Sequence, residues 1–170
     1  MSLAWLERWA NRYARERFDI GRPSADVYLT RWTVLGSRFA GGGSAVFLHH
    51  FHRSDGDDAL HDHPWPFASL ILSGGYYEHT ADKRGLVSRR WYGPGRVLTR
   101  PATFRHRVEL PPGRDCWTLV FRGRKAKSWS FFCLDGLGRL TGRAVPWRSF
   151  ADRLDAGALG CGPEAEGVAG

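Results

Sequence analysis

The sequence predicts an all-β fold, a small barrel or sandwich with one short helix at its N-terminus. From residue 26 onward, short segments rich in β-branched and aromatic residues alternate with turns of Gly, Pro and Asp. No second helical pattern of useful length separates these segments, which disfavours a parallel α/β architecture. At 170 residues, the chain is long enough to bury the core of one domain.

The N-terminal segment 3–18 has the spacing of a short amphipathic helix. Apolar side chains recur at helical intervals from Leu3 to Tyr13, with Arg and Glu between them. Gly21 and Pro23 are expected to end this segment. We expect the helix to pack against the outside of the domain.

The segments after the helix define the expected strands and the domain limits. Strands are predicted near residues 27–35, 45–53, 68–73, 76–80, 87–92, 96–100, 104–110, 115–122, 128–134 and 139–145. The helix and its linker then occupy residues 1–22, and the β-barrel domain occupies residues 23–154. The tail at 155–170 is rich in Gly and has no aromatic residue, so we expect it to be disordered.

Composition and charge exclude several classes of protein. The formal net charge is +8, but the basic residues are scattered along the chain, which disfavours a nucleic-acid partner and is equally explained by an anionic small substrate. No apolar run approaches the ~20 residues of a membrane span, so no membrane association is expected. The N-terminus lacks the apolar core of a signal peptide, so we expect a cytoplasmic protein.

The cysteines are three in number, Cys116, Cys133 and Cys161, and no two have CxxC spacing. We interpret this odd count as excluding a disulfide framework and a cysteine zinc finger, in keeping with a reducing cytoplasm. Cys116 and Cys133 lie in apolar segments, where they are expected to be small buried side chains.

The histidines point to a metal site. His61 and His63 form an H-x-H pattern, and in an extended strand residues two apart point to the same face. His106 lies in another alternating stretch, where it shares a face with Phe104 and Val108. Three imidazoles could therefore converge on one ion, and imidazole is a ligand for Fe, Zn, Cu and Ni.

The other histidines are assigned supporting or purely structural roles. His49 and His50 cannot both face the interior of one strand, and His52 shares the face of His50. The acidic loop that contains Asp55 could orient ligand histidines through their second ring nitrogen.

Two segments of the sequence resemble the motifs of the cupin superfamily. In the first, His61-x-His63 is followed by an apolar strand and Gly74; in the second, Gly95, Pro101 and His106 have the order and spacing of the cupin pattern. The resemblance covers about residues 45–122. It implies a cupin-type double-stranded β-helix barrel, also called a jelly roll.

The sequence also departs from the cupin pattern. Ala68 stands where many cupins carry a metal-binding Glu, Thr103 replaces a Gly, and Leu110 replaces an Asn. The resemblance therefore implies a site of three histidines, as in the thiol dioxygenases among the cupins. Glu78 or His79 could supply a fourth ligand, or the metal could be weakly held or absent.

By this resemblance, the expected function is that of a non-heme Fe(II) oxygenase that acts on a small polar or anionic substrate. The alternatives are an isomerase, lyase or hydrolase that uses zinc or manganese without O₂, and a small-ligand-binding cupin that is not an enzyme; nickel is a further possible ion. A homodimer is expected, because the outer strands must be covered. The expected residues are the metal ligands His61, His63 and His106, the catalytic residues Glu78, Tyr76 and Tyr92, and the substrate-binding residues Arg53, Arg38 and Trp65.

Overall fold

The computed structural model describes residues 3–22, 26–37, 43–55, 59–158 and 160–162. The elements in these ranges are α1 (Ala4–Tyr13), β1 (Glu16–Arg22), β2 (Asp26–Leu35), β3 (Ala45–Phe51), β4 (Leu60–His61), β5 (Phe67–Ser73), β6 (Tyr76–Ala81), β7 (Val87–Tyr92), β8 (Val97–Arg100), β9 (His106–Glu109), β10 (Cys116–Arg122), β11 (Ser130–Leu134), β12 (Leu140–Pro146) and α2 (Trp147–Asp155).

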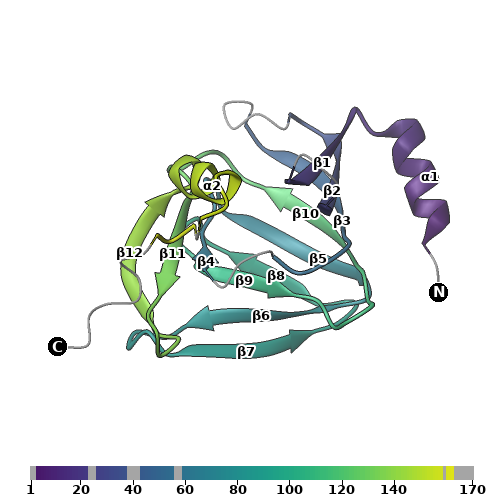
Figure 1. The fold of residues 1–170 in the computed structure, drawn as a ribbon. Coiled ribbons are helices and arrows are strands. Elements are labelled where there is room, and N and C mark those ends of the chain that lie inside the picture. The colour runs from purple at the N-terminus through teal and green to yellow at the C-terminus, as the bar shows by residue number, and fades with distance from the viewer. Residues whose placement is uncertain (1–2, 23–25, 38–42, 56–58, 159, 163–170) are drawn as a thin grey trace.

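The strands in the described part of the chain form two six-stranded sheets. One has the order β1-β2-β3-β10-β5-β8 and the other β12-β11-β4-β9-β6-β7 (Figure 1). Strand neighbours such as β3 and β10, or β4 and β9, are antiparallel although they lie far apart in the sequence. This arrangement is a double-stranded β-helix, so the predicted all-β jelly roll is confirmed.

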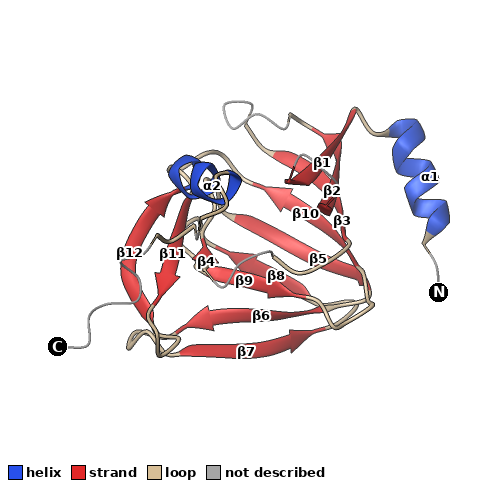
Figure 2. Ribbon diagram, viewed as in Figure 1, coloured by secondary structure: helices blue, strands red, loops and turns tan. Residues whose placement is uncertain are grey.

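The N-terminal helix packs where the sequence predicts, but it is shorter. Ala10 of α1 is buried against Trp32, Leu48 and Trp117, on the outer side of the first sheet (Figure 2). The helix ends at Tyr13, and β1 occupies residues that the sequence assigned to the helix and linker. Pairing of β1 with β2 along its whole length satisfies more backbone groups than the last turn of a helix could, so strand formation dominates there.

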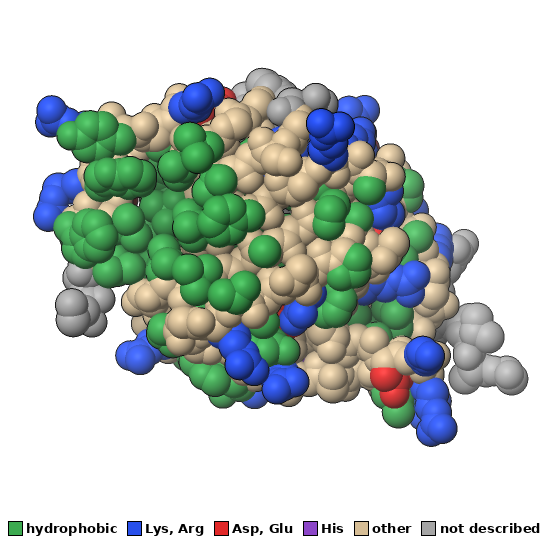
Figure 3. Space-filling model, turned by 180° about the vertical axis from the view of Figure 1, so that it is seen from behind, with side chains coloured by type: hydrophobic (Ala, Val, Ile, Leu, Met, Phe, Trp, Pro, Cys, Tyr) green, Lys and Arg blue, Asp and Glu red, His purple; other side chains and the backbone are tan. Residues whose placement is uncertain are grey.

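The opposite face of α1 is exposed and aromatic. Trp5, Trp9 and Tyr13 are spaced four residues apart and are 57%, 40% and 62% exposed. Seen from behind, hydrophobic side chains gather on the side of the molecule where α1 lies (Figure 3). In the described ranges, no helix is long and apolar enough to cross a membrane.

A second helix, α2, was not predicted from the sequence. It begins directly after β12, and its Phe150 is buried and stacks on Phe131 of β11, with 4.0 Å between the ring centroids. At nine residues it is too short for its periodicity to stand out beside the strand pattern of the chain.

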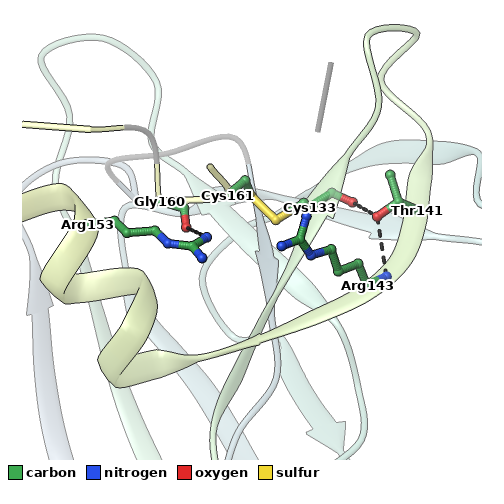
Figure 4. The surroundings of a disulfide bond; sticks show 6 residues. All are labelled: Cys133, Thr141, Arg143, Arg153, Gly160 and Cys161. Carbon is green, nitrogen blue, oxygen red and sulfur yellow. Dashed lines mark hydrogen bonds between the residues drawn. A yellow bond between two sulfur atoms is a disulfide. The ribbon is translucent and has the colours of Figure 1, made fainter. Parts of the chain in front are cut away.

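A disulfide joins Cys133 of β11 to Cys161, which corrects the prediction that the cysteines are unpaired (Figure 4). The odd count misled because Cys116 is the free, buried member and the other two pair over 28 positions. The bond joins the described residues 160–162 of the predicted tail to β11, whereas residues 159 and 163–170 lie outside the described residues.

The turn between β5 and β6 requires glycine at position 74. Gly74 has φ of 74°, and a Cβ added there would lie 2.0 Å from the carbonyl oxygen of Asp115. We expect Gly74→Ala to lower the free energy of unfolding by about 2 kcal/mol or more, measured by urea denaturation. Gly95→Ala, at φ of 80° with open space around the added Cβ, should cost less. An equal loss of unfolding free energy in both variants would show that the short distance between position 74 and the carbonyl oxygen of Asp115 does not matter.

Candidate metal centre

Three histidines, two from neighbouring strands and one from the loop after β4, converge inside the barrel. His61 of β4 and His106 of β9 are register partners, and His63 follows two residues after β4 ends. One ring nitrogen from each histidine lies within 4.8 Å of the others. The Nε2 atoms of His63 and His106 are 2.8 Å apart. The predicted H-x-H face and the inward direction of His106 therefore bring these three side chains together.

Backbone hydrogen bonds of Asp62 and His63 hold this segment in place. The amide of Asp62 donates to the carbonyl of Ser130 at 3.1 Å, and the amide of His63 donates to the carbonyl of Ala102 at 3.3 Å. The buried Asp62 carboxylate accepts the amide of Ser130 at 3.0 Å and pairs with Lys127. Asp62 therefore fixes the loop, which keeps His61 and His63 on one side of the chain.

The protonation states of the histidines suit a metal ion. Burial, reinforced by neighbouring histidines, holds the pKa of His61 and of His63 well below the ordinary value. Both rings are therefore neutral near pH 7 and can donate a lone pair. Three neutral imidazole nitrogens clustered in this way form a donor set that a divalent metal ion fits.

Glu78 lies behind His106 rather than among the three ring nitrogens. Its Oε1 accepts a hydrogen bond from Nδ1 of His106 at 2.8 Å, and its carboxylate also pairs with Arg100. Burial alone would raise the pKa of Glu78, but the hydrogen bonds from His106 and Arg100 outweigh it and lower that pKa. A proton fixed on Nδ1 leaves Nε2 of His106 with a free lone pair toward the cluster.

Asp55 stands in a similar position behind His61. Its Oδ2 lies 3.8 Å from Nδ1 of His61 and accepts the amide of Val108 at 2.7 Å. Burial raises the pKa of Asp55. His79, the other candidate for a fourth ligand, pairs instead with Glu109 at 2.6 Å.

The cluster opens into a cavity of about 400 Å³ that is lined by both sheets. All three histidines line it, as do the apolar side chains that alternate along the strands. Its aromatic members include Phe18, Tyr28, Phe47, Trp65, Trp129 and Trp147. This volume lies within the ~300–1,000 Å³ range of pockets for small ligands.

The cavity also contains a guanidinium. Arg31 of β2 donates from Nε to Nε2 of His49 on β3 at 2.8 Å, and both side chains line the cavity. Burial lowers the pKa of Arg31 to about 10, so it remains charged near pH 7. Burial and the charge of Arg31 hold the pKa of His49 well below its usual value, so His49 is neutral and accepts the hydrogen bond.

The other predicted site residues have different positions. Trp65 and Tyr76 line the cavity, and burial raises the pKa of Tyr76 so that its hydroxyl stays protonated. Tyr92 lies beside Tyr76 as its register partner, and neither it nor Arg53 is among the residues that line the cavity. Arg38 lies outside the described residues.

His50 and His52 point away from the cavity, as the alternation along β3 predicts. His50 stacks on Trp117 with 4.0 Å between ring centroids and pairs with Asp115 at 2.7 Å. The Nε2 atom of His52 lies 2.9 Å from the hydroxyl of Thr30. Of the histidines in β3, only His49 therefore lines the cavity in the described part of the chain.

No protein-family model and no curated protein matches this sequence. Solved structures do match the fold. The polyketide cyclase RemF from Streptomyces resistomycificus is similar over 81% of this chain and 87% of its own, with 16% identity and a TM-score of 0.54. The Fe(II) form of HppE is similar over 63% of this chain and 55% of its own, with 11% identity and a TM-score of 0.50.

A cupin-2 domain from Rhodospirillum rubrum, Rru_A2000, matches over 66% of this chain and 72% of its own, with 16% identity and a TM-score of 0.49. The sheet order and the two stronger matches establish the fold. The three-histidine cluster lies on the two segments that resemble the cupin motifs. The chain therefore has the double-stranded β-helix fold that the resemblance to cupins implies, with a candidate site for a divalent metal ion in its interior.

Proposed function

We propose that this chain is a metal-dependent cupin enzyme, a non-heme Fe(II) oxygenase whose metal ligands are His61, His63 and His106. The observation that carries the proposal is the convergence of three imidazoles on the wall of a substrate-sized cavity. Iron held there would supply the reaction with O₂ that side chains alone do not provide. An Fe(II) enzyme, HppE, has a similar fold, which is compatible with this choice of metal.

The chain's own residues hold and shield the reacting groups. Glu78 keeps the proton of His106 on Nδ1, so Nε2 faces the site. The aromatic side chains of the cavity exclude bulk water, which strengthens electrostatic interactions inside it. Tyr76 keeps its proton and can donate a hydrogen bond to an oxygen of a bound substrate. Arg31 offers a positive charge to an anionic group.

The first test measures metal content. Untagged protein purified under low oxygen should contain about one iron ion per chain, measured by elemental analysis. The variants His63→Ala and His106→Ala should lose it, whereas His50→Ala, which removes a histidine outside the cavity, should retain it. The iron-loaded protein should consume O₂ when a compound that it accepts as substrate is added.

Two results would contradict this proposal. The first is zinc or manganese at full occupancy together with turnover in the absence of O₂, which would contradict the oxygenase and support a non-oxidative enzyme. The absence of metal from the wild-type protein after reconstitution with Fe(II), Zn(II) and Mn(II) would overturn the metal centre itself.

A further inference from the structure

The cavity contains the positive charge of Arg31, and the described acidic side chain that lines the same cavity, Asp55, contacts His61 and the amide of Val108 instead. In the part of the chain that the structure describes, the ion pairs involve other basic residues and none involves Arg31. Its printed hydrogen bond runs from Nε to His49, which is neutral. Arg122 is a second buried guanidinium close enough to lower the pKa of Arg31 by charge repulsion. A charge of this kind is stabilised when an anion binds beside it.

The surroundings of Arg31 are aromatic rather than polar. Its guanidinium lies 5.0 Å from the ring centroid of Phe47, and that of Arg122 lies 5.8 Å from the same ring. On β1, next to β2, Phe18 and Ile20 also line the cavity. A small polar molecule would leave these walls uncovered, whereas a ring system would fill them and remove apolar surface from water.

The positive charge and the histidine cluster lie on opposite sheets. Arg31 belongs to the sheet that contains β2 and β3, and His61 and His106 belong to the sheet that contains β4 and β9. All of them line one cavity, so a ligand that reaches both must extend from one sheet to the other. Phe47 lies beside Arg31 and Phe67 lies beside His63, and these two rings belong to one packed cluster, so the cavity wall between the charge and the histidines is aromatic.

We propose that the substrate is a largely apolar acid built on rings, such as an aromatic carboxylate, whose anionic group pairs with Arg31 while its ring system lies between the aromatic walls. This deepens the proposed function and rests on it only for the statement that the far end of the molecule faces the histidines. Of the sequence-based expectation of a small polar or anionic substrate, it keeps the anionic alternative, and it assigns the anion site to Arg31 in place of Arg53 and Arg38.

The test measures binding to metal-free protein, so that a carboxylate cannot bind to a metal ion instead. After treatment with EDTA and dialysis, isothermal titration calorimetry is performed with 2-naphthoate, with the neutral 2-naphthalenemethanol, and with propionate. Because charge-assisted hydrogen bonds to a buried guanidinium are strong, 2-naphthoate should bind about 10- to 100-fold more tightly than the neutral alcohol. Propionate has the charge without the rings and should bind at least about 10-fold more weakly than 2-naphthoate.

Variants of Arg31 assign the effect to this residue. Arg31→Gln should lose the preference for the acid over the alcohol but should still bind the alcohol, which also shows that the cavity is intact. Arg31→Lys keeps the charge without the planar fork and should retain part of the preference. Arg89→Gln is the matched control, since Arg89 is an exposed arginine on β7 that pairs with Glu109, and it should behave as wild type.

Several results would overturn this proposal. They are equal affinities for the acid and the alcohol, an unchanged preference in Arg31→Gln, tighter binding of propionate than of 2-naphthoate, and no saturable binding of 2-naphthoate up to millimolar concentrations. Since no metal is present, these results are independent of the metal analysis. If the metal analysis finds no iron in protein that was not treated with EDTA, and the metal-free protein still prefers the acid, the proposed oxygenase is overturned and the substrate class stands.

Discussion

Replacing Glu78 with alanine should weaken metal binding by about 10- to 100-fold and lower the free energy of unfolding by about 3 kcal/mol. Glu78 is 2% exposed and accepts hydrogen bonds from His106 and Arg100. Without the carboxylate, the His106 ring loses the partner that fixes its tautomer, and the positive charge of Arg100 loses its counter-charge. The affinity is measured by competition with a chelating dye, and the stability by urea denaturation of the metal-free protein.

Two further variants separate these effects. Glu78→Gln keeps the shape and an acceptor oxygen but removes the charge, so it should fall between wild type and Glu78→Ala in both measurements. Glu109→Ala is the matched control, because Glu109 also pairs with a histidine and an arginine but is more exposed. Glu109→Ala should lower the free energy of unfolding by less than ~1 kcal/mol and should leave metal affinity unchanged. Equal metal affinity in Glu78→Ala and wild type would refute the positioning role.

Loss of the disulfide should lower the free energy of unfolding by about 3–4 kcal/mol. Cys133 and Cys161 are 28 positions apart, and the bond restricts the unfolded chain by closing a loop that contains β12 and α2. In the folded protein, Figure 4 shows Arg153 of α2 directed at Gly160, with its Nη1 3.4 Å from the carbonyl oxygen. The variant Cys161→Ser is compared with wild type by urea denaturation.

Reductant provides an internal control for this variant. Dithiothreitol should reduce the stability of wild type to that of Cys161→Ser and should have no effect on the variant itself. The double variant, Cys133→Ser with Cys161→Ser, should be about as stable as either single variant. Any further loss in its free energy of unfolding should not exceed the cost of burying one more hydroxyl. Wild-type protein whose stability is insensitive to reductant after complete reduction would show that the bond contributes nothing.

The sequence was informative about the metal centre because its signals are local. His61 and His63 are two residues apart, and strand alternation alone places them on one face. His106 follows from the alternation of its own short segment. The expected strands also follow from local patterns, because each is bounded by turn residues such as Gly74.

Features that depend on distant pairing could not be predicted in the same way. The position of Glu78 behind His106 requires the register of β6 against β9, which no local pattern specifies. The role of Arg31 depends on the register of β2 against β3, which pairs Arg31 with His49 so that both side chains face the cavity. The disulfide joins two cysteines whose pairing is a property of the folded chain, since sequence spacing alone does not determine connectivity.

The smallest strand of the barrel has a consequence for the ion. β4 consists of Leu60 and His61, and it meets β9 at the single pair formed by His61 and His106. An ion held by these histidines would therefore link two strands that pair at only one position in the described structure. It would also link the loop at His63 to both strands. Metal binding would then stabilise the pairing of β4 with β9, and loss of the metal would leave this part of the sheet less ordered.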